Sequence, residues 1–121
     1  MSEFYETWED RKILQFRDLQ VTHIALHPKL VMKLTGGVSF ESTALPLKKA
    51  SPAYGAPVTS FAELSQREVE GLIGARPLSW AIFDDGDHRM VFSNKWHVLL
   101  APGADDSWEL QVPGEPPLTF P

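Results

Sequence analysis

The chain has 121 residues, of which 43% are hydrophobic and 22% charged, a composition typical of one globular domain and not of a disordered segment. A chain of this length can bury enough apolar surface to fold without a metal or disulfides. It contains no cysteine, which excludes disulfides, thiolate zinc sites and cysteine nucleophiles. Beyond Phe83 there are seven acids and two bases, whereas the earlier residues hold nine of each, so the net charge of −5 lies in the last third. An acidic surface repels phosphate backbones, and we expect no DNA or RNA partner.

The first ten residues predict a short helix, because Phe4 and Trp8 are one helical turn apart. Residues 19–43 then predict a first β meander, since apolar and polar side chains alternate on both sides of Gly36 and Gly37.

The hydrophobic pattern also selects the register of the hairpin around these glycines. A two-residue loop of Gly36 and Gly37 would place Leu34 opposite Ser39, which mixes apolar and polar residues on one face. A three-residue loop, 35–37, places Leu34 opposite Val38 and Met32 opposite Phe40. We therefore predict the longer loop, with Gly37 in the left-handed conformation.

Residues 48–59 are rich in Pro, Ala, Ser and Gly and are expected to form an exposed linker. A helix is predicted over residues 60–73. Thr59 or Ser60 would cap its start, and Gly71 or Gly74 would end it. Its apolar stripe would consist of Phe61, Leu64, Val69, Leu72 and Ile73.

Residues 77–120 predict a second β meander with an Asp-Gly turn at 84–87. The segments 30–38 and 88–96 align without a gap in their pattern, with Ile24 matching Ile82 at the same offset, which suggests two versions of one unit. The expected fold is a single mainly β domain over residues 1–121 with a minor α component (α+β). Its two antiparallel meanders would form one sheet, a sandwich or a partial barrel, with the helix covering an open face.

No metal or catalytic site is predicted. His23 and His27 lie four residues apart in a strand and its turn, which separates them by roughly 13 Å at 3.3 Å per residue. The Asp-Gly turn lacks the glutamate that a calcium loop needs, because Phe92 occupies that place. We therefore expect no cofactor and no enzyme activity.

The acidic residues and tryptophans point to protein binding instead. Trp108 is surrounded by Asp105, Asp106 and Glu109, an arrangement that suits an aromatic anchor within an acidic rim. The alternative is a strand tryptophan that packs inward with its neighbours outward. The candidate partner-binding residues are Asp84, Asp85, Asp87, Asp105, Asp106, Trp108 and Glu109.

The second half of the chain also resembles a small bacterial β-rich domain family of unknown function. The resemblance rests on Gly71-Leu72-Ile73-Gly74, an Asp-Gly turn, and Ser107-Trp108-Glu109-Leu110 followed by Pro113-Gly114. It covers roughly residues 19–120 and departs from the family at Arg76-Pro77 and in the 48–59 connection. The family is similar to immunity proteins of polymorphic or contact-delivered toxins, and its motifs carry no catalytic residue.

We therefore expect an immunity or inhibitor protein that binds and neutralises a cognate, basic toxin or effector protein. Met1-Ser2-Glu3 shows no secretory signal, and no apolar run is long enough to span a bilayer, so a cytoplasmic location without membrane association is predicted. Homo-oligomer formation stays open. The alternative function is that of a small-ligand or sensory domain with a pocket between sheet and helix.

Overall fold

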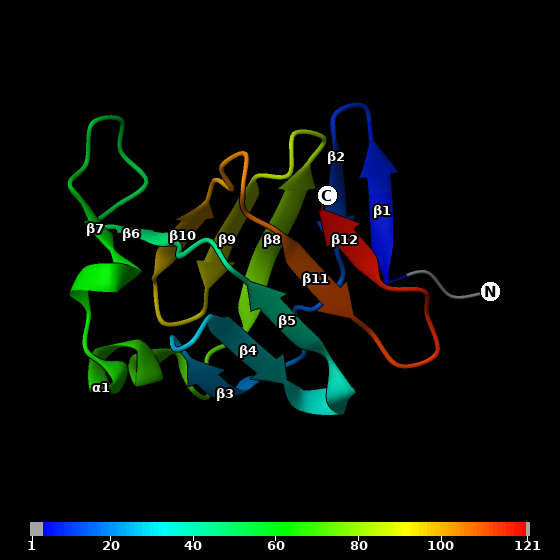
Figure 1. The fold of residues 1–121 in the computed structure, drawn as a ribbon, viewed down its shortest axis with the longest axis horizontal. Helices are drawn as coiled ribbons and strands as arrows, with labels where there is room; N and C mark the ends of the chain where they lie inside the picture. The colour runs from blue at the N-terminus through cyan, green and yellow to red at the C-terminus, as the bar shows by residue number, and fades with distance from the viewer. Residues whose placement is uncertain (1–3, 121) are drawn as a thin grey trace.

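The protein is described by a computed structural model that covers residues 4–120, so residues 1–3 and 121 lie outside the described part. Two antiparallel sheets face each other across one core (Figure 1). The seven-stranded sheet has the order β1 (Tyr5–Trp8), β2 (Arg11–Leu14), β8 (Pro77–Phe83), β9 (His88–Phe92), β10 (His97–Leu100), β6 (Leu47–Lys49), β7 (Val58–Ser60). The five-stranded sheet has the order β12 (Leu118–Phe120), β11 (Trp108–Gln111), β5 (Ser39–Ser42), β4 (Leu30–Leu34), β3 (Val21–Ala25).

The expected fold class is confirmed, since strands make up 44% of the structure and one short helix accompanies them. Along the strands, side chains point alternately inward and outward, and the inward ones are mostly apolar. The inward faces of the two sheets therefore form the core. Phe40 on β5 and Trp80 on β8 are fully buried and meet edge to face, with ring centroids 5.5 Å apart. Aromatic rings from the two sheets therefore form the centre of the core.

The predicted register of the first hairpin is confirmed. Met32 lies opposite Phe40, and the Leu34 N–H donates to the Val38 carbonyl at 2.9 Å across the loop Thr35–Gly37. Gly37 has a φ of +81°, the left-handed conformation that the loop requires, and Gly36 shares it.

The second hairpin repeats this geometry. The Phe92 N–H donates to the Trp96 carbonyl at 2.9 Å, and Lys95 takes the left-handed place of Gly37 with a φ of +74°. In the first unit the Thr35 N–H donates to the Gln20 carbonyl. In the second, the Ser93 N–H donates to the Arg76 carbonyl. The hydroxyls of Thr35 and Ser93 accept the N–H of these same partners.

The strands before the two hairpins also correspond, down to a register shift at Val21/His23 in β3 and at Pro77/Ser79 in β8. In these strands, corresponding residues of the two units are 56 positions apart in the sequence, whereas in the hairpins they are 58 positions apart. Ile24, opposite Met32, therefore corresponds to Trp80, opposite Met90, and the sequence alignment of Ile24 with Ile82 is wrong. The difference of two residues lies in the strands, because β8 has seven residues and β3 has five, whereas the connections 26–29 and 84–87 are equally long.

The two units exchange their last strands. β6 follows β5 in the chain but pairs with β10, and β11 follows β10 but pairs with β5. Consequently the predicted second meander is divided, with β8, β9 and β10 in one sheet and β11 and β12 in the other. Both sheets contain the same five-strand order, β3-β4-β5-β11-β12 and β8-β9-β10-β6-β7, and β1 and β2 extend only the second.

The left-handed Lys95 gives a testable consequence of this correspondence. A residue with a β carbon is sterically strained in the left-handed conformation, whereas Gly37 in the equivalent loop has no β carbon and is not strained. We expect Lys95→Gly to raise the free energy of unfolding by about 0.5 kcal/mol, measured by urea denaturation. Lys95→Ala, which keeps the β carbon, should give no such gain, and equal effects of the two changes would refute the strain.

Three predicted segments differ from the structure. The helix predicted for the first ten residues is wrong for residues 5–10, which belong to the β1–β2 hairpin that turns at Glu9 and Asp10, and residues 1–3 lie outside the described part. The 48–59 segment is an exposed loop only in its middle, because β6 and β7 pair at its two ends.

The predicted helix over 60–73 is interrupted. It consists of the 3₁₀ turns Phe61–Glu63 and Glu70–Leu72 and the single α-helical turn α1 (Gln66–Val69). Ser60 caps the first 3₁₀ turn, as predicted. Ser65 caps α1 separately, through a capping box with Glu68. Gly74, at a φ of +90°, follows the last turn.

Candidate functional site

The turn between β8 and β9 carries the first three predicted carboxylates. The Gly86 N–H donates to the Phe83 carbonyl at 2.9 Å, and the Asp87 N–H donates to Oδ1 of Asp85 at 3.0 Å. Asp84 and Asp85 are exposed and Asp87 is half-buried. The turn is thus fixed by its own backbone and by the Asp85 carboxylate, and Asp84 and Asp85 remain exposed to solvent.

Gly86 in this turn contacts the side chains of Trp108 and Phe120. The indole Nε1 of Trp108 donates to the Gly86 carbonyl at 3.0 Å. A β carbon on Gly86 would lie 2.7 Å from the Phe120 ring, which in turn stacks on Trp108. Gly86 is required for this close approach, and its φ of +93° requires glycine as well.

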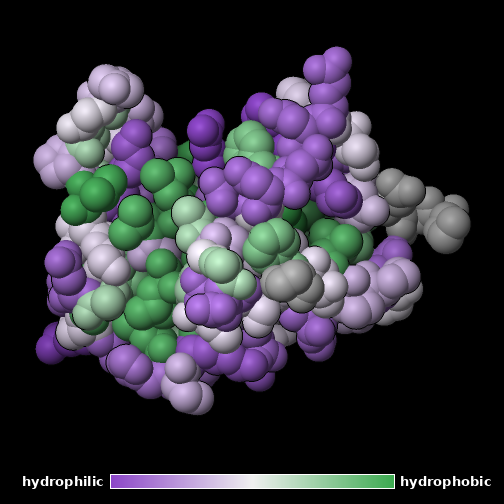
Figure 2. Space-filling view, turned by 45° about the horizontal axis from the view of Figure 1, so that its top comes forward, coloured by the Kyte–Doolittle hydropathy of each residue, from purple (hydrophilic) through white to green (hydrophobic). Residues whose placement is uncertain are grey.

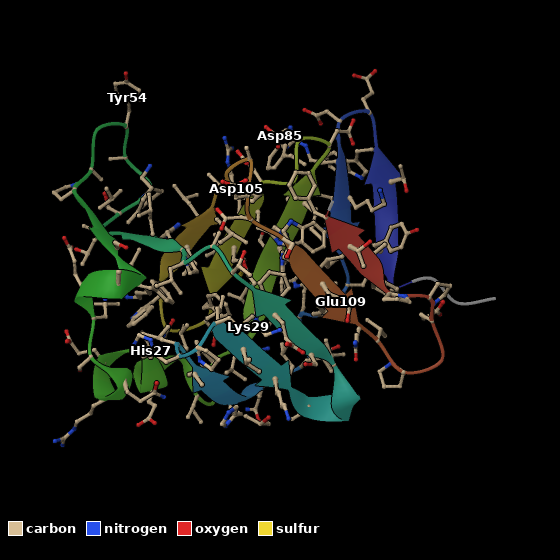
Figure 3. The ribbon with its side chains drawn as sticks, in the orientation of Figure 1. His27, Lys29, Tyr54, Asp85, Asp105 and Glu109 are labelled. Atoms are coloured by element: carbon tan, nitrogen blue, oxygen red, sulfur yellow. The ribbon has the colours of Figure 1, made fainter. Side chains whose placement is uncertain are left out.

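Asp105 and Asp106 have different roles in the loop between β10 and β11. Asp106 accepts the Gly103 N–H at 2.8 Å and the Thr43 hydroxyl at 3.1 Å, which ties the loop to the end of β5. Asp105 is exposed and points outward. In Figure 3, Asp105 and Asp85 lie toward the same end of the molecule.

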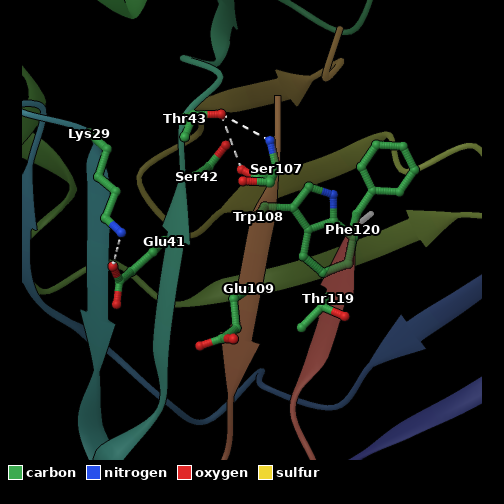
Figure 4. Close-up of a pocket in the computed structure, with 9 residues that line it drawn as sticks. All are labelled: Lys29, Glu41, Ser42, Thr43, Ser107, Trp108, Glu109, Thr119 and Phe120. Atoms are coloured by element: carbon green, nitrogen blue, oxygen red, sulfur yellow. Dashed lines mark hydrogen bonds and ion pairs between the residues drawn. The ribbon is translucent and has the colours of Figure 1, made fainter. Parts of the chain in front are cut away.

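The structure does not bring Trp108 and Glu109 to that end. Trp108 is only 6% exposed and belongs to the core, so the inward alternative is the one observed. Glu109 lies on the outer face of the five-stranded sheet, opposite Glu41, which pairs with Lys29 at 2.7 Å (Figure 4). The Glu109 carboxylate accepts a hydrogen bond from the side-chain amide of Gln111.

The exposed tryptophan is Trp8, which sequence reasoning missed. It is 57% exposed at the end of β1, beside Glu9 and Asp10. The Asp84 N–H donates to the Asp10 carbonyl at 2.9 Å, so this hairpin turn touches the β8–β9 turn. The signal was present in the sequence, as a tryptophan between acids, but a helix was predicted there.

We call this region the acidic end. It comprises the β1–β2 turn, the β8–β9 turn and the β10–β11 loop, with the carboxylates Glu9, Asp10, Asp84, Asp85, Asp87 and Asp105.

Most charges of the acidic end have no cationic partner. Among residues 4–120, the ion pairs are Arg11 with Asp10 and Lys29 with Glu41. Burial, followed by repulsion from Asp85, raises the pKa of Asp87, and Arg89 offsets this only in part. An incoming cation would relieve that repulsion.

A groove of about 450 Å³ adjoins the acidic end. Its apolar lining includes Leu45, Leu47, Phe83 and Leu99, and its polar side is formed by Asp85, Asp87 and Arg89. Figure 2 shows the molecule hollowed between two projections, the β6–β7 loop on the left and the β1–β2 hairpin on the right. Apolar surface gathers on the left of this hollow.

His88 lies beneath the turn in the core and is 1% exposed. Its Nδ1 accepts the Trp80 indole N–H at 2.8 Å, so the neutral ring carries its proton on Nε2, which has no hydrogen-bond partner among residues 4–120. Burial lowers the pKa of His88 to about 3. The ring meets Trp108 edge to face, with centroids 4.4 Å apart.

The space between the sheets and the helical segment is filled by side chains. The cavity there, lined by Ile24, Phe61, Leu72 and neighbouring residues, measures about 10 Å³. Ligand pockets are roughly thirty times larger or more. This location therefore offers no support for the small-ligand alternative.

The described residues give two further results. No three His, Asp or Glu side chains within 4–120 are placed to share a metal ion. In the same part of the chain, no helix has the length and apolar character needed to cross a bilayer.

In comparisons with protein-family models, curated proteins and solved structures, nothing matches this chain.

Proposed function

We propose that this protein is a binding module whose acidic end captures a basic partner protein, and that it serves as an immunity or inhibitor protein in the cytoplasm. One observation carries the proposal: three separate chain segments bring to one end carboxylates that have no cationic partner among the described residues, next to an exposed tryptophan. Complementary charge accelerates association and selects among partners, and tryptophan often supplies binding energy at interfaces.

A binding role fits the chemistry better than a catalytic one. His88 is the buried titratable group nearest the turn, but burial keeps it neutral and leaves it only 1% exposed. The carboxylates of Asp84, Asp85 and Asp105 are exposed and can contact a macromolecule directly. A toxin that acts on nucleic acid is usually basic, so an acidic inhibitor would cover the surface that the substrate needs.

The proposal is tested by co-expressing the protein with toxin candidates encoded beside it. We expect one candidate that arrests growth alone to be neutralised and to co-purify with the protein in low salt. The complex should associate more slowly as salt is raised, because screening weakens steering between opposite charges. If none of the candidates is bound or neutralised, the immunity role is refuted.

A further inference from the structure

We propose that the groove beside Asp85 and Asp87 accepts an aliphatic side chain of the partner that is flanked in sequence by lysine or arginine. This inference rests on the proposed function and specifies what the partner must present.

The apolar part of the groove argues for an aliphatic side chain. Leu47 on β6 and Leu99 on β10 are paired neighbours, and Leu45 extends their apolar surface. Of the five large hydrophobic residues exposed within residues 4–120, three lie on the β6–β7 hairpin: Leu47, Tyr54 and Val58. Apolar surface concentrated beside a hollow is a feature of interaction sites.

The polar side of the groove argues for flanking cations. Asp85 and Asp87 stand on this side, and neither forms an ion pair within the described chain. Arg89 also lines the groove, but its guanidinium lies over the Phe83 ring, 5.0 Å from the ring centre, forms no ion pair with either carboxylate, and offsets the raised pKa of Asp87 only in part. The carboxylates are therefore left for a partner's lysine or arginine.

The geometry thus combines two requirements in one segment. An aliphatic side chain alone would leave the carboxylates unpaired, and a cation alone would leave the leucines exposed to water. Both groups placed on neighbouring residues of one flexible segment would satisfy both sides of the groove, because the long side chains of lysine and arginine can reach back to the carboxylates.

The test uses three short peptides and the ¹⁵N-labelled full chain. The probe is acetyl-Gly-Lys-Leu-Arg-Gly-amide, and its controls replace Leu by Ser or replace both bases by Glu. We expect the probe to shift the amide signals of Leu47, Asp85, Asp87 and Leu99 in the NMR spectrum. Loss of the leucine should weaken binding about tenfold or more, because its buried surface supplies much of the affinity.

Two protein variants locate the binding. Leu47→Ser should weaken binding of the probe about tenfold. Val58→Ser, which removes an exposed apolar side chain from the neighbouring strand β7, should leave it unchanged. Thermal melting of both variants verifies that they are folded.

The outcomes separate this inference from the proposed function. Equal binding of the leucine and serine peptides, binding outside the groove, or no binding would refute the groove as a leucine site. In those cases, neutralisation of a basic toxin that is lost on charge reversal of the acidic end would still support the proposed function.

Discussion

Unfolding experiments should show that His88 contributes a loss of about 3 kcal/mol of stability between pH 7.5 and pH 4.5. The unfolded chain binds a proton on this histidine below its ordinary pKa of 6.5, whereas burial keeps the native pKa at about 3. Between these values the unfolded state binds more protons. The stability is therefore complete above pH 6.5 and decreases as the pH falls toward 3.

The measurement is urea denaturation of the wild type and of His88→Asn at both pH values. Asparagine places an oxygen near the position of Nδ1, where it can still accept the Trp80 indole N–H, but it does not titrate. The variant should be less stable at pH 7.5, because it leaves a cavity, and its stability should change less with pH. Since all carboxylates are shared, an equal pH dependence in both proteins would show that His88 is protonated in the native state.

Replacement of Gly86 by alanine should lower the free energy of unfolding by about 3 kcal/mol. A β carbon there would be 2.7 Å from the Phe120 ring, and a φ of +93° is strained for any residue with a side chain. The left-handed conformation costs about 1 to 2 kcal/mol, and overpacking adds about 1 to 3 kcal/mol. Chemical denaturation monitored by tryptophan fluorescence would measure the effect.

Two controls divide this cost into its parts. Gly114 has a φ of +80° with open space around it, so Gly114→Ala reports the backbone strain alone, about 1 kcal/mol. In a Phe120→Ala background, Gly86→Ala should cost about as little as Gly114→Ala does, because the clash is gone. An undiminished cost in that background would contradict the steric explanation.

The sequence predicts most strands because alternation is a local property. The register of the first hairpin followed from avoiding mixed pairs, and the same rule applies to the second. Alternation assigns a face to each side chain but does not choose the partner of a strand. The exchange of β6 and β11 between sheets therefore could not be predicted from the pattern.

The helices predicted for the first ten residues and for residues 60–73 rested on sequence patterns that other structures also produce. A four-residue spacing such as that of Phe4 and Trp8 also occurs on one face of a strand, where every second residue points the same way. In the later segment, the second cap at Ser65 was available in the sequence as a serine three residues before Glu68. It divides the segment into short turns.

The candidate site was predicted in its loops and missed in its aromatic residue. Asp-rich turns are exposed almost regardless of topology, and Asp84, Asp85 and Asp105 are exposed in the structure, whereas their role in partner binding stays a prediction. Trp108 shares its strand face with the fully buried Leu110, and this spacing of two favoured the core from the start. The contact between the β1–β2 and β8–β9 turns depends on sheet order, which the sequence does not reveal.

Charge reversal tests the proposal that the acidic end binds a basic partner. Asp85→Lys combined with Asp105→Lys should reduce the association rate constant with the neutralised toxin by tenfold or more at low salt, by the usual scale of steering effects. The charge-matched control reverses two exposed acids away from the acidic end, Asp18→Lys and Glu63→Lys, and should change the rate far less. Equal rates for the two double variants would refute binding of the partner at the acidic end.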